Sequence, residues 1–206
     1  KFTKINFSKC DNHFEAQSFQ NSTIMFSGSL KTLALGLNKI SNDIRWLGSG
    51  PRSGIGELII PAVQPGSSIM PGKVNPVICE SMIQVCSQVI ANDSAITLGG
   101  LGSIFELNVM LPLIAHNLLF SINILSNAIN VFSEKLVLPL KANVNKCEQY
   151  IEGSLAMCTA LVPIVGYDKA AEIAYEAYHA NQTIRQILKS KKILSDKQIN
   201  KLLDPQ

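Results

Sequence analysis

The sequence predicts an all-α protein, a bundle of long helices followed by a small helical domain. Three long stretches repeat apolar residues at the three- and four-residue spacing of an α-helix. After Pro139 and the polar run 141–145, the helical stretches become shorter. We therefore predict a bundle domain over residues 1–143 and a small helical domain over residues 144–206.

The first long helix is predicted from about Phe14 to Leu47, after a polar and irregular segment, residues 1–13. Its apolar residues follow the a/d spacing of a coiled coil at Phe26, Leu30, Leu33, Leu37, Ile40, Ile44 and Leu47. A stripe held in register over this length is expected to be core, with no part in chemistry.

Two more long helices are predicted, over about 75–97 and 104–133. The apolar seam of the first consists of Ile78, Met82, Val85, Val89 and Ile96. Within the second, Pro112 predicts a kink near Asn108, because proline removes a helical hydrogen bond. Three such helices cannot bury all their apolar faces against one another, so we expect partner helices from other chains.

The small domain is predicted to hold four short helices. They cover about 146–161, 168–180, 183–188 and 195–203. Asp168 and Ser195 are predicted as N-caps, and Gln198 follows Ser195 at capping-box spacing.

Composition excludes several classes of protein. Hydrophobic residues make up 47% and charged residues only 16%, which favours a chain with much surface buried in an oligomer. The net charge of +3 is too small to indicate nucleic-acid binding. No unbroken apolar run is long enough to predict a membrane span.

Five cysteines occur without CxxC or Cys/His ligand spacing. This pattern predicts reduced thiols in a cytosol-like compartment and no metal site. The chain begins with Lys1 rather than Met, and we expect it to be a piece of a longer subunit.

The stretch 66–76 carries the chemistry of the sequence. Its glycines allow close backbone approach to a ligand, and successive N–H groups in such a loop can bind an anion. Lys73 adds a positive charge, and Asn75 adds an amide that can hold a carboxylate oxygen. The Gly- and Pro-rich residues 48–71 lead into it, so we predict a mobile loop over 48–76 that binds a small polyanion.

The sequence GSSIMPGKVNP of this loop resembles the signature of the fumarase/aspartase superfamily, and within it the class II fumarases. Other similar segments are NDIR at 42–45, GSGPR at 48–52, GIGE at 54–57, FELNV at 105–109 and GYDKAA at 166–171. The resemblance implies the C-terminal part of a subunit whose helices join those of three other copies in a twenty-helix core. It therefore implies a homotetramer with active sites shared between subunits.

The resemblance also implies a reaction, the reversible anti-addition of water to fumarate giving (S)-malate. Ser67 matches the serine proposed as the base that removes the carbon-bound proton. Ser68 matches a substrate-contacting position, and Lys73, Val74 and Asn75 match the group that grips a substrate carboxylate. No cofactor is implied.

Glu80 matches a glutamate that pairs with a histidine in the family, so that the histidine can act on water. None of His13, His116 and His179 matches that histidine. We therefore expect only part of an active site in this chain, and no activity from it alone.

Two alternatives stay open. An aspartate ammonia-lyase would share the loop, although FELN at 105–108 and GYDK at 166–169 favour fumarase. A non-catalytic helical assembly fragment would keep the bundle without chemistry. For the hydratase, the resemblance implies the cytoplasm, or the mitochondrion in a eukaryotic cell.

Overall fold

The computed structural model describes residues 3–64, 66, 69–70 and 72–204. It divides the chain into two compact units, Lys1–Lys141 and Ala142–Gln206. The division falls beside the boundary predicted after residue 143, and the short strand β4 (Lys141–Ala142) lies there. The fold is dominated by helices, which confirms the all-α prediction.

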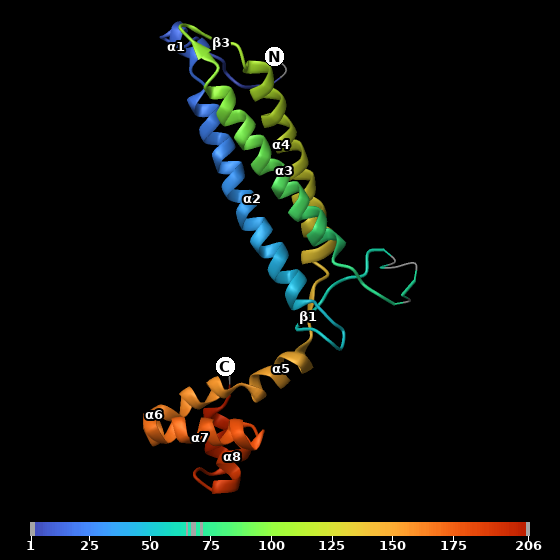
Figure 1. The fold of residues 1–206 in the computed structure, drawn as a ribbon, viewed down its shortest axis with the longest axis vertical. Helices are drawn as coiled ribbons and strands as arrows, with labels where there is room; N and C mark the ends of the chain where they lie inside the picture. The colour runs from blue at the N-terminus through green and yellow to red at the C-terminus, as the bar shows by residue number, and fades with distance from the viewer. Residues whose placement is uncertain (1–2, 65, 67–68, 71, 205–206) are drawn as a thin grey trace. The chain divides into compact units, whose positions relative to one another are not determined.

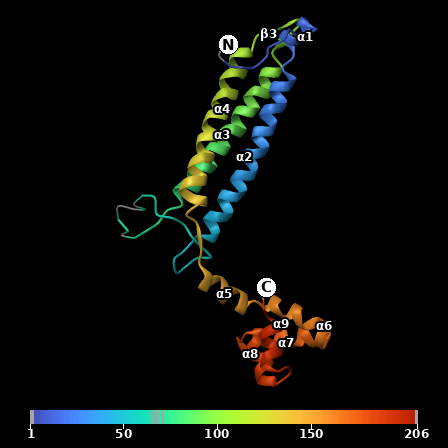
Figure 2. The same ribbon diagram turned by 180° about the vertical axis from the view of Figure 1, so that it is seen from behind.

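The first unit is a bundle of three long helices (Figure 1). They are α2 (Asn21–Leu47), α3 (Val77–Gly100) and α4 (Leu111–Phe132). The short α1 (His13–Ser18) precedes α2, and a π-helical turn, Ser133–Val137, extends α4. Helix α3 packs against both α2 and α4, and the view from behind shows the same arrangement (Figure 2).

The inward face of α2 differs from the predicted stripe. Leu30, Leu37 and Ile44 do pack in the bundle core. However, Phe26, Leu33 and Ile40 are 48%, 47% and 47% exposed. The neighbouring row of small residues is buried instead, namely Ser27, Ala34 and Ser41. Small side chains let α2 approach α3 closely, which turns the larger row outward.

The seam predicted for α3 is confirmed. Met82, Val89 and Ile96 are buried, and Ile78 and Val85 pack against the bundle core. Residues from all three long helices complete this core, with Ala34, Ile44, Cys79, Cys86, Leu125 and Phe132 among its buried members.

The predicted kink near Asn108 is wrong, because the helix begins after that residue. A hairpin of β2 (Ser103–Ile104) and β3 (Leu107–Asn108) pairs Ser103 with Asn108 in antiparallel register. The buried Asn108 side chain donates to the Gly99 carbonyl at 3.1 Å and accepts from the Met110 N–H at 2.8 Å. Pro112 then lies in the first turn of α4, where a helix needs no backbone donor.

The stretch Leu111–Val137 is long and apolar enough to span a membrane, by length and composition. Its inward residues, Ile114, Leu125 and Phe132, pack in the bundle, but only 17% of the apolar window is buried within this chain. Asparagines at 117, 123, 127 and 130 interrupt the apolar run, which is why the sequence predicted no span. A core helix of a larger helical assembly has the same composition.

The second unit consists of short helices around its own core. They are α5 (Val144–Gly153), the 3-10 helix Leu155–Leu161, α6 (Val162–Val165), α7 (Tyr167–Ala180), α8 (Ile184–Lys191) and α9 (Asp196–Leu202). Ser195 caps α9 in a capping box with Gln198, as predicted. Asp168 is not an N-cap, since the cap of α7 is Gly166 and Asp168 lies in the first turn. The core includes Leu161, Ile173, Ile184, Leu188 and Ile199.

The packing of α2 yields a test of which row faces α3. Ala34→Leu should lower the free energy of unfolding by about 1–3 kcal/mol, because Ala34 is fully buried and the larger side chain overfills the core. Leu33→Ala, one residue away on the exposed row, should change it by less than about 1 kcal/mol in the monomeric chain. Urea titrations followed by circular dichroism measure both. A larger loss for Leu33→Ala than for Ala34→Leu would restore the stripe predicted from sequence.

Candidate active-site loop

The candidate site lies in the connection between α2 and α3. Figure 1 shows this connection leaving the bundle at the end where α2 stops and α3 starts. Its described residues include the short strand β1 (Leu58–Ile59) and otherwise form turns and irregular chain. The position of the loop is thus set by the ends of two packed helices.

The first part of the connection is a tight turn around Ser49. The Ser49 hydroxyl donates to the Trp46 carbonyl at 2.6 Å and accepts from the Ile55 N–H at 3.0 Å. Gly54 packs on the Ser49 backbone so closely that a β-carbon would lie 2.5 Å from the Ser49 carbonyl. The Ser49 side chain and Gly54 together determine the direction in which the chain continues after α2.

The signature stretch closes on itself through Gly66 and Asn75. The Asn75 side-chain amide donates to the Gly66 carbonyl. A β-carbon on Gly66 would lie 1.9 Å from the Lys73 carbonyl oxygen, so the chain at Gly66 and the chain at Lys73 are in backbone contact. Between them, Gly72 has a φ of +78°, a conformation that favours glycine. The glycines are therefore required by contact and by backbone angle.

The residues predicted for the site are placed as follows. Ser67 and Ser68 lie outside the described residues. Lys73 and Val74 are exposed, and Asn75 is half-buried. Since one N–H of the Asn75 amide bonds to Gly66, its second N–H is the one available to a ligand.

Glu80 lies in the first turn of α3 and its side chain is exposed. Its backbone N–H donates to the Pro76 carbonyl at 3.0 Å, so the helix starts directly after the signature stretch. The amino end of a helix carries partial positive charge, which favours this carboxylate and any anion held by the loop. Lys73 thus lies four residues in the chain before a helix end that favours negative charge.

Arg45 is a further charge at this end of the bundle, and it was not predicted as a site residue. Burial raises the pKa of the Cys79 thiol to about 11, the Arg45 charge opposes this shift, and the Glu80 charge adds to it. Arg45, in the last turn of α2, therefore acts electrostatically on the first turn of α3. The NDIR segment contained this residue, but only helix packing brings it to α3.

The cysteines offer no nucleophile to this site. Burial keeps Cys79 protonated at neutral pH and also raises the pKa of the buried Cys86 thiol. Within the described ranges, His, Cys, Asp and Glu side chains form no group of three that could hold a metal ion. The described side chains of the loop offer cations, amides, hydroxyls and the Glu57 carboxylate.

Two family models match the chain. One, described as lyase, matches residues 1–91, and the other, described as fumarase C C-terminus, matches residues 157–206. A class II fumarate hydratase of Wigglesworthia glossinidia brevipalpis is 46% identical over the whole chain. A mitochondrial fumarate hydratase of Dictyostelium discoideum is 43% identical over 205 residues. The chain spans 44% and 42% of the lengths of these two relatives.

Solved structures agree with these matches. A fumarate lyase/delta crystallin from Brucella melitensis, bound to cobalt, superposes with a TM-score of 0.94 at 46% identity. The match covers 99% of this chain and 44% of that one. A class II fumarase from Schistosoma mansoni gives a TM-score of 0.87 at 36% identity, over 97% of this chain and 42% of that one.

The Gly66 contact yields a test of the loop closure. Gly66→Ala should force the loop open, because the added β-carbon overlaps the Lys73 carbonyl. Trypsin should then cut after Lys73 on the order of ten times faster, which corresponds to losing about one hydrogen bond. Mass spectrometry follows the cut, and Gly153→Ala is the control, since nothing lies within 4 Å of a β-carbon there. Equal cutting rates for the two variants would mean that the loop is not closed at Gly66.

Proposed function

We propose, from the premise that this chain belongs to the fumarase family of lyases and matches the C-terminal part of its subunit, that the full-length protein is a fumarate hydratase. The reaction is the reversible anti-addition of water to fumarate, giving (S)-malate. The observation that carries the proposal is the GSSIMPGKVNP stretch, closed by the contacts of Gly66 with Lys73 and Asn75, with the Lys73 side chain exposed.

The proposed chemistry needs positive charge at the loop. Removing the proton next to a carboxylate turns that group into an aci-carboxylate with two negative charges, so groups that stabilise growing negative charge lower the barrier. The proposed sources of this charge are Lys73 of the loop, the amino end of α3, and Arg45 in the last turn of α2. Donors fixed before the reaction act as an oxyanion hole does.

Ser67 is the proposed base, taking the carbon-bound proton of malate in the dehydration direction. A serine alkoxide is too basic to persist in water, so the loop N–H groups and Lys73 must stabilise it. Ser68, Val74 and Asn75 are proposed to hold the substrate, with the second N–H of the Asn75 amide directed to a carboxylate oxygen. Asn75 would then both close the loop and bind the substrate.

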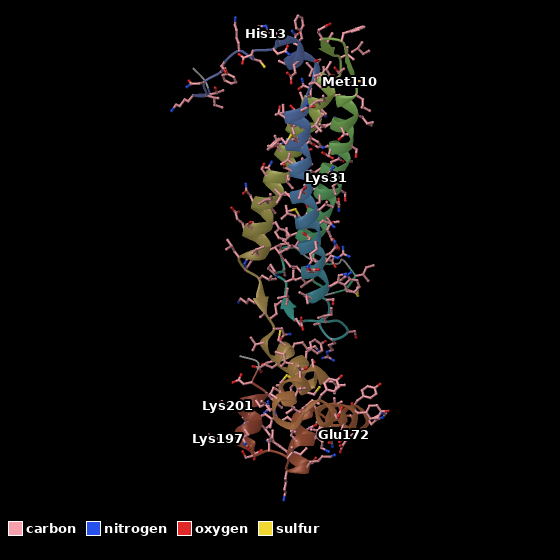
Figure 3. All side chains as sticks on the ribbon, turned by 90° about the vertical axis from the view of Figure 1, so that its left-hand side faces the viewer. His13, Lys31, Met110, Glu172, Lys197 and Lys201 are labelled. Carbon is pink, nitrogen blue, oxygen red and sulfur yellow. The ribbon has the colours of Figure 1, made fainter. Side chains whose placement is uncertain are left out.

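Glu80 is proposed to orient a histidine that acts on the water side of the reaction. That histidine would come from sequence outside this chain. His13 lies at the far end of the bundle from the loop, as Figure 3 shows. His116 is an exposed residue of α4 that stacks on Phe120, which supports no role at this loop.

The bundle supports a homotetramer as the proposed assembly. Large apolar side chains remain exposed along α2 and α4, including Met25, Phe26, Leu33, Ile40, Leu113, Leu119, Phe120 and Val131. Helices of other copies would bury them and bring in the rest of each active site. We propose the cytoplasm, or the mitochondrion in a eukaryotic cell, and the tricarboxylic acid cycle, as the setting for the reaction.

A product assay separates the hydratase from the ammonia-lyase that shares the loop. The full-length protein, incubated with fumarate and ammonium together, should form malate and no aspartate. Ser67→Ala should reduce the rate at least a hundredfold, as expected for a group that takes part in proton transfer. Chromatographic separation of the products measures both effects. Formation of aspartate would move the assignment to the ammonia-lyase.

The 206-residue chain alone should show no turnover of fumarate or malate. Its loop lacks the partner histidine, so proton transfer to and from water has no matched acid or base. Absorbance of fumarate in the ultraviolet follows the reaction, with the full-length protein as the positive control. Turnover by the purified chain would refute the proposed division of the active site.

A further inference from the structure

A carboxylate lies inside the bundle, away from the candidate site. Asp93 of α3 is only 4% exposed. The Ser27 hydroxyl donates to Asp93 Oδ1 at 2.7 Å, and Lys31 Nζ donates to Asp93 Oδ2 at 2.5 Å. Both partners belong to α2, so each oxygen of the carboxylate ties α3 to α2. Lys31, labelled in Figure 3, lies well along the bundle from the loop.

The adjacent residue of α3 makes the matching connection to α4. Asn92 is 4% exposed and donates from Nδ2 to the Ser121 hydroxyl at 2.9 Å. Its Oδ1 accepts from Gln88 Nε2 at 2.8 Å, within the same helix. Neighbouring residues on a helix point about 100° apart, so one turn of α3 connects both flanking helices at one level. We call Ser27, Lys31, Asn92, Asp93 and Ser121 the polar layer.

We propose that the polar layer sets the register of the three helices, and that Asp93 is thereby a positioning residue for the loop 48–76. The apolar rows of α2 repeat every seven residues, with small side chains at 27, 34 and 41 and large ones at 30, 37 and 44. Apolar packing alone therefore accepts a slip of α2 by one heptad. One heptad along α2, by contrast, the serine and the lysine of the polar layer are not repeated.

A slipped register would leave Asp93 buried without its partners. Moving α2 by seven residues brings Ala34 and Asn38 to the places of Ser27 and Lys31. Alanine offers no donor, and asparagine offers a neutral amide in place of the positive charge, so the buried carboxylate would lose its counter-charge and one hydrogen bond. Burying the Asp93 carboxylate costs desolvation free energy in both registers. Only the native register offsets that cost with the hydrogen bonds from Ser27 and Lys31, so the slipped register is much less stable. A single polar core position fixes register in coiled coils for this reason.

The register matters to the site because the loop is anchored to both helices. Its first residue follows the end of α2, and its last precedes the start of α3. A one-heptad slip would move these anchors relative to each other by about 10 Å, at 1.5 Å per residue. The end of α2, with Arg45 in its last turn, would then no longer lie where it does now relative to the first turn of α3 and the loop that precedes it. This consequence for catalysis rests on the proposed function, whereas the register itself does not.

The experiment uses the single tryptophan of the chain, Trp46, which lies in the last turn of α2. With fluorotryptophan incorporated, the fluorine NMR spectrum of the chain should show one resonance. The variant Ser27→Ala/Lys31→Met/Asp93→Leu should keep its melting temperature within a few degrees, because a well-packed apolar replacement of a buried ion pair is often neutral. It should nevertheless split or broaden the Trp46 resonance, since α2 then occupies more than one register.

Three companion variants complete the test. Ser27→Ala/Lys31→Met strands the Asp93 carboxylate and should lower the melting temperature by roughly 6–15 °C. Asp93→Asn keeps the size and an acceptor, and should retain one resonance. Lys39→Met/Asp43→Leu removes a matched ion pair that is exposed on α2, and should change neither readout. Should the triple variant fail to fold, Asp93→Leu compared with Asp93→Asn carries the same comparison.

A single unshifted Trp46 resonance in the triple variant, or in Asp93→Leu if the triple does not fold, would overturn the proposal. In the full-length protein, the triple variant should also lose at least tenfold in kcat/KM for fumarate, while Asp93→Asn stays within about threefold of the parent. If the parent has no hydratase activity, the proposed function fails and the fluorine spectra still decide the register.

Discussion

The placement of α3 between α2 and α4 is the constraint on which the rest of this structure depends. Its buried row of Met82, Val89 and Ile96 supplies the apolar contact, and small residues on α2 allow the helices to approach closely. The polar layer crosses the bundle at one level of α3. This packing sets the spacing between the end of α2 and the start of α3, the two points to which the loop is attached.

The loop is an extension of that packing. It leaves α2 through the turn at Ser49 and enters α3 directly after Asn75 and Pro76. Its closure uses backbone contact between Gly66 and Lys73, so its shape depends on the absence of a side chain as much as on any side chain present. A loop of this kind can hold charged groups in fixed positions without a core of its own, which is what an anion-binding site requires.

The outward apolar rows are more than three helices can bury among themselves. Three helices can each bury one face among themselves, but α2 and α4 carry apolar residues on more than one face. Leu111–Val137 is long and apolar for the same reason, because it carries apolar residues on its outward face as well as on the face in the bundle. The second unit has a core of its own, in which short helices surround Leu161, Ile173 and Leu188.

The sequence by itself determined the helical class, the seam of α3, the capping box at Ser195 and the position of the signature loop. Each of these depends on residues close together in the chain, where periodicity and cap chemistry act directly. Tertiary structure alone decided which row of α2 faces inward. Ala34 and Leu33 are both compatible with a helix, and only packing against the neighbouring helices determines which of them is buried. It also decided that α4 starts at Leu111, through the hydrogen bonds of Asn108 across a hairpin. The Arg45 charge acts on Cys79 of α3, and Asp93 bonds to Ser27 and Lys31, only because residues far apart in sequence meet in the folded bundle.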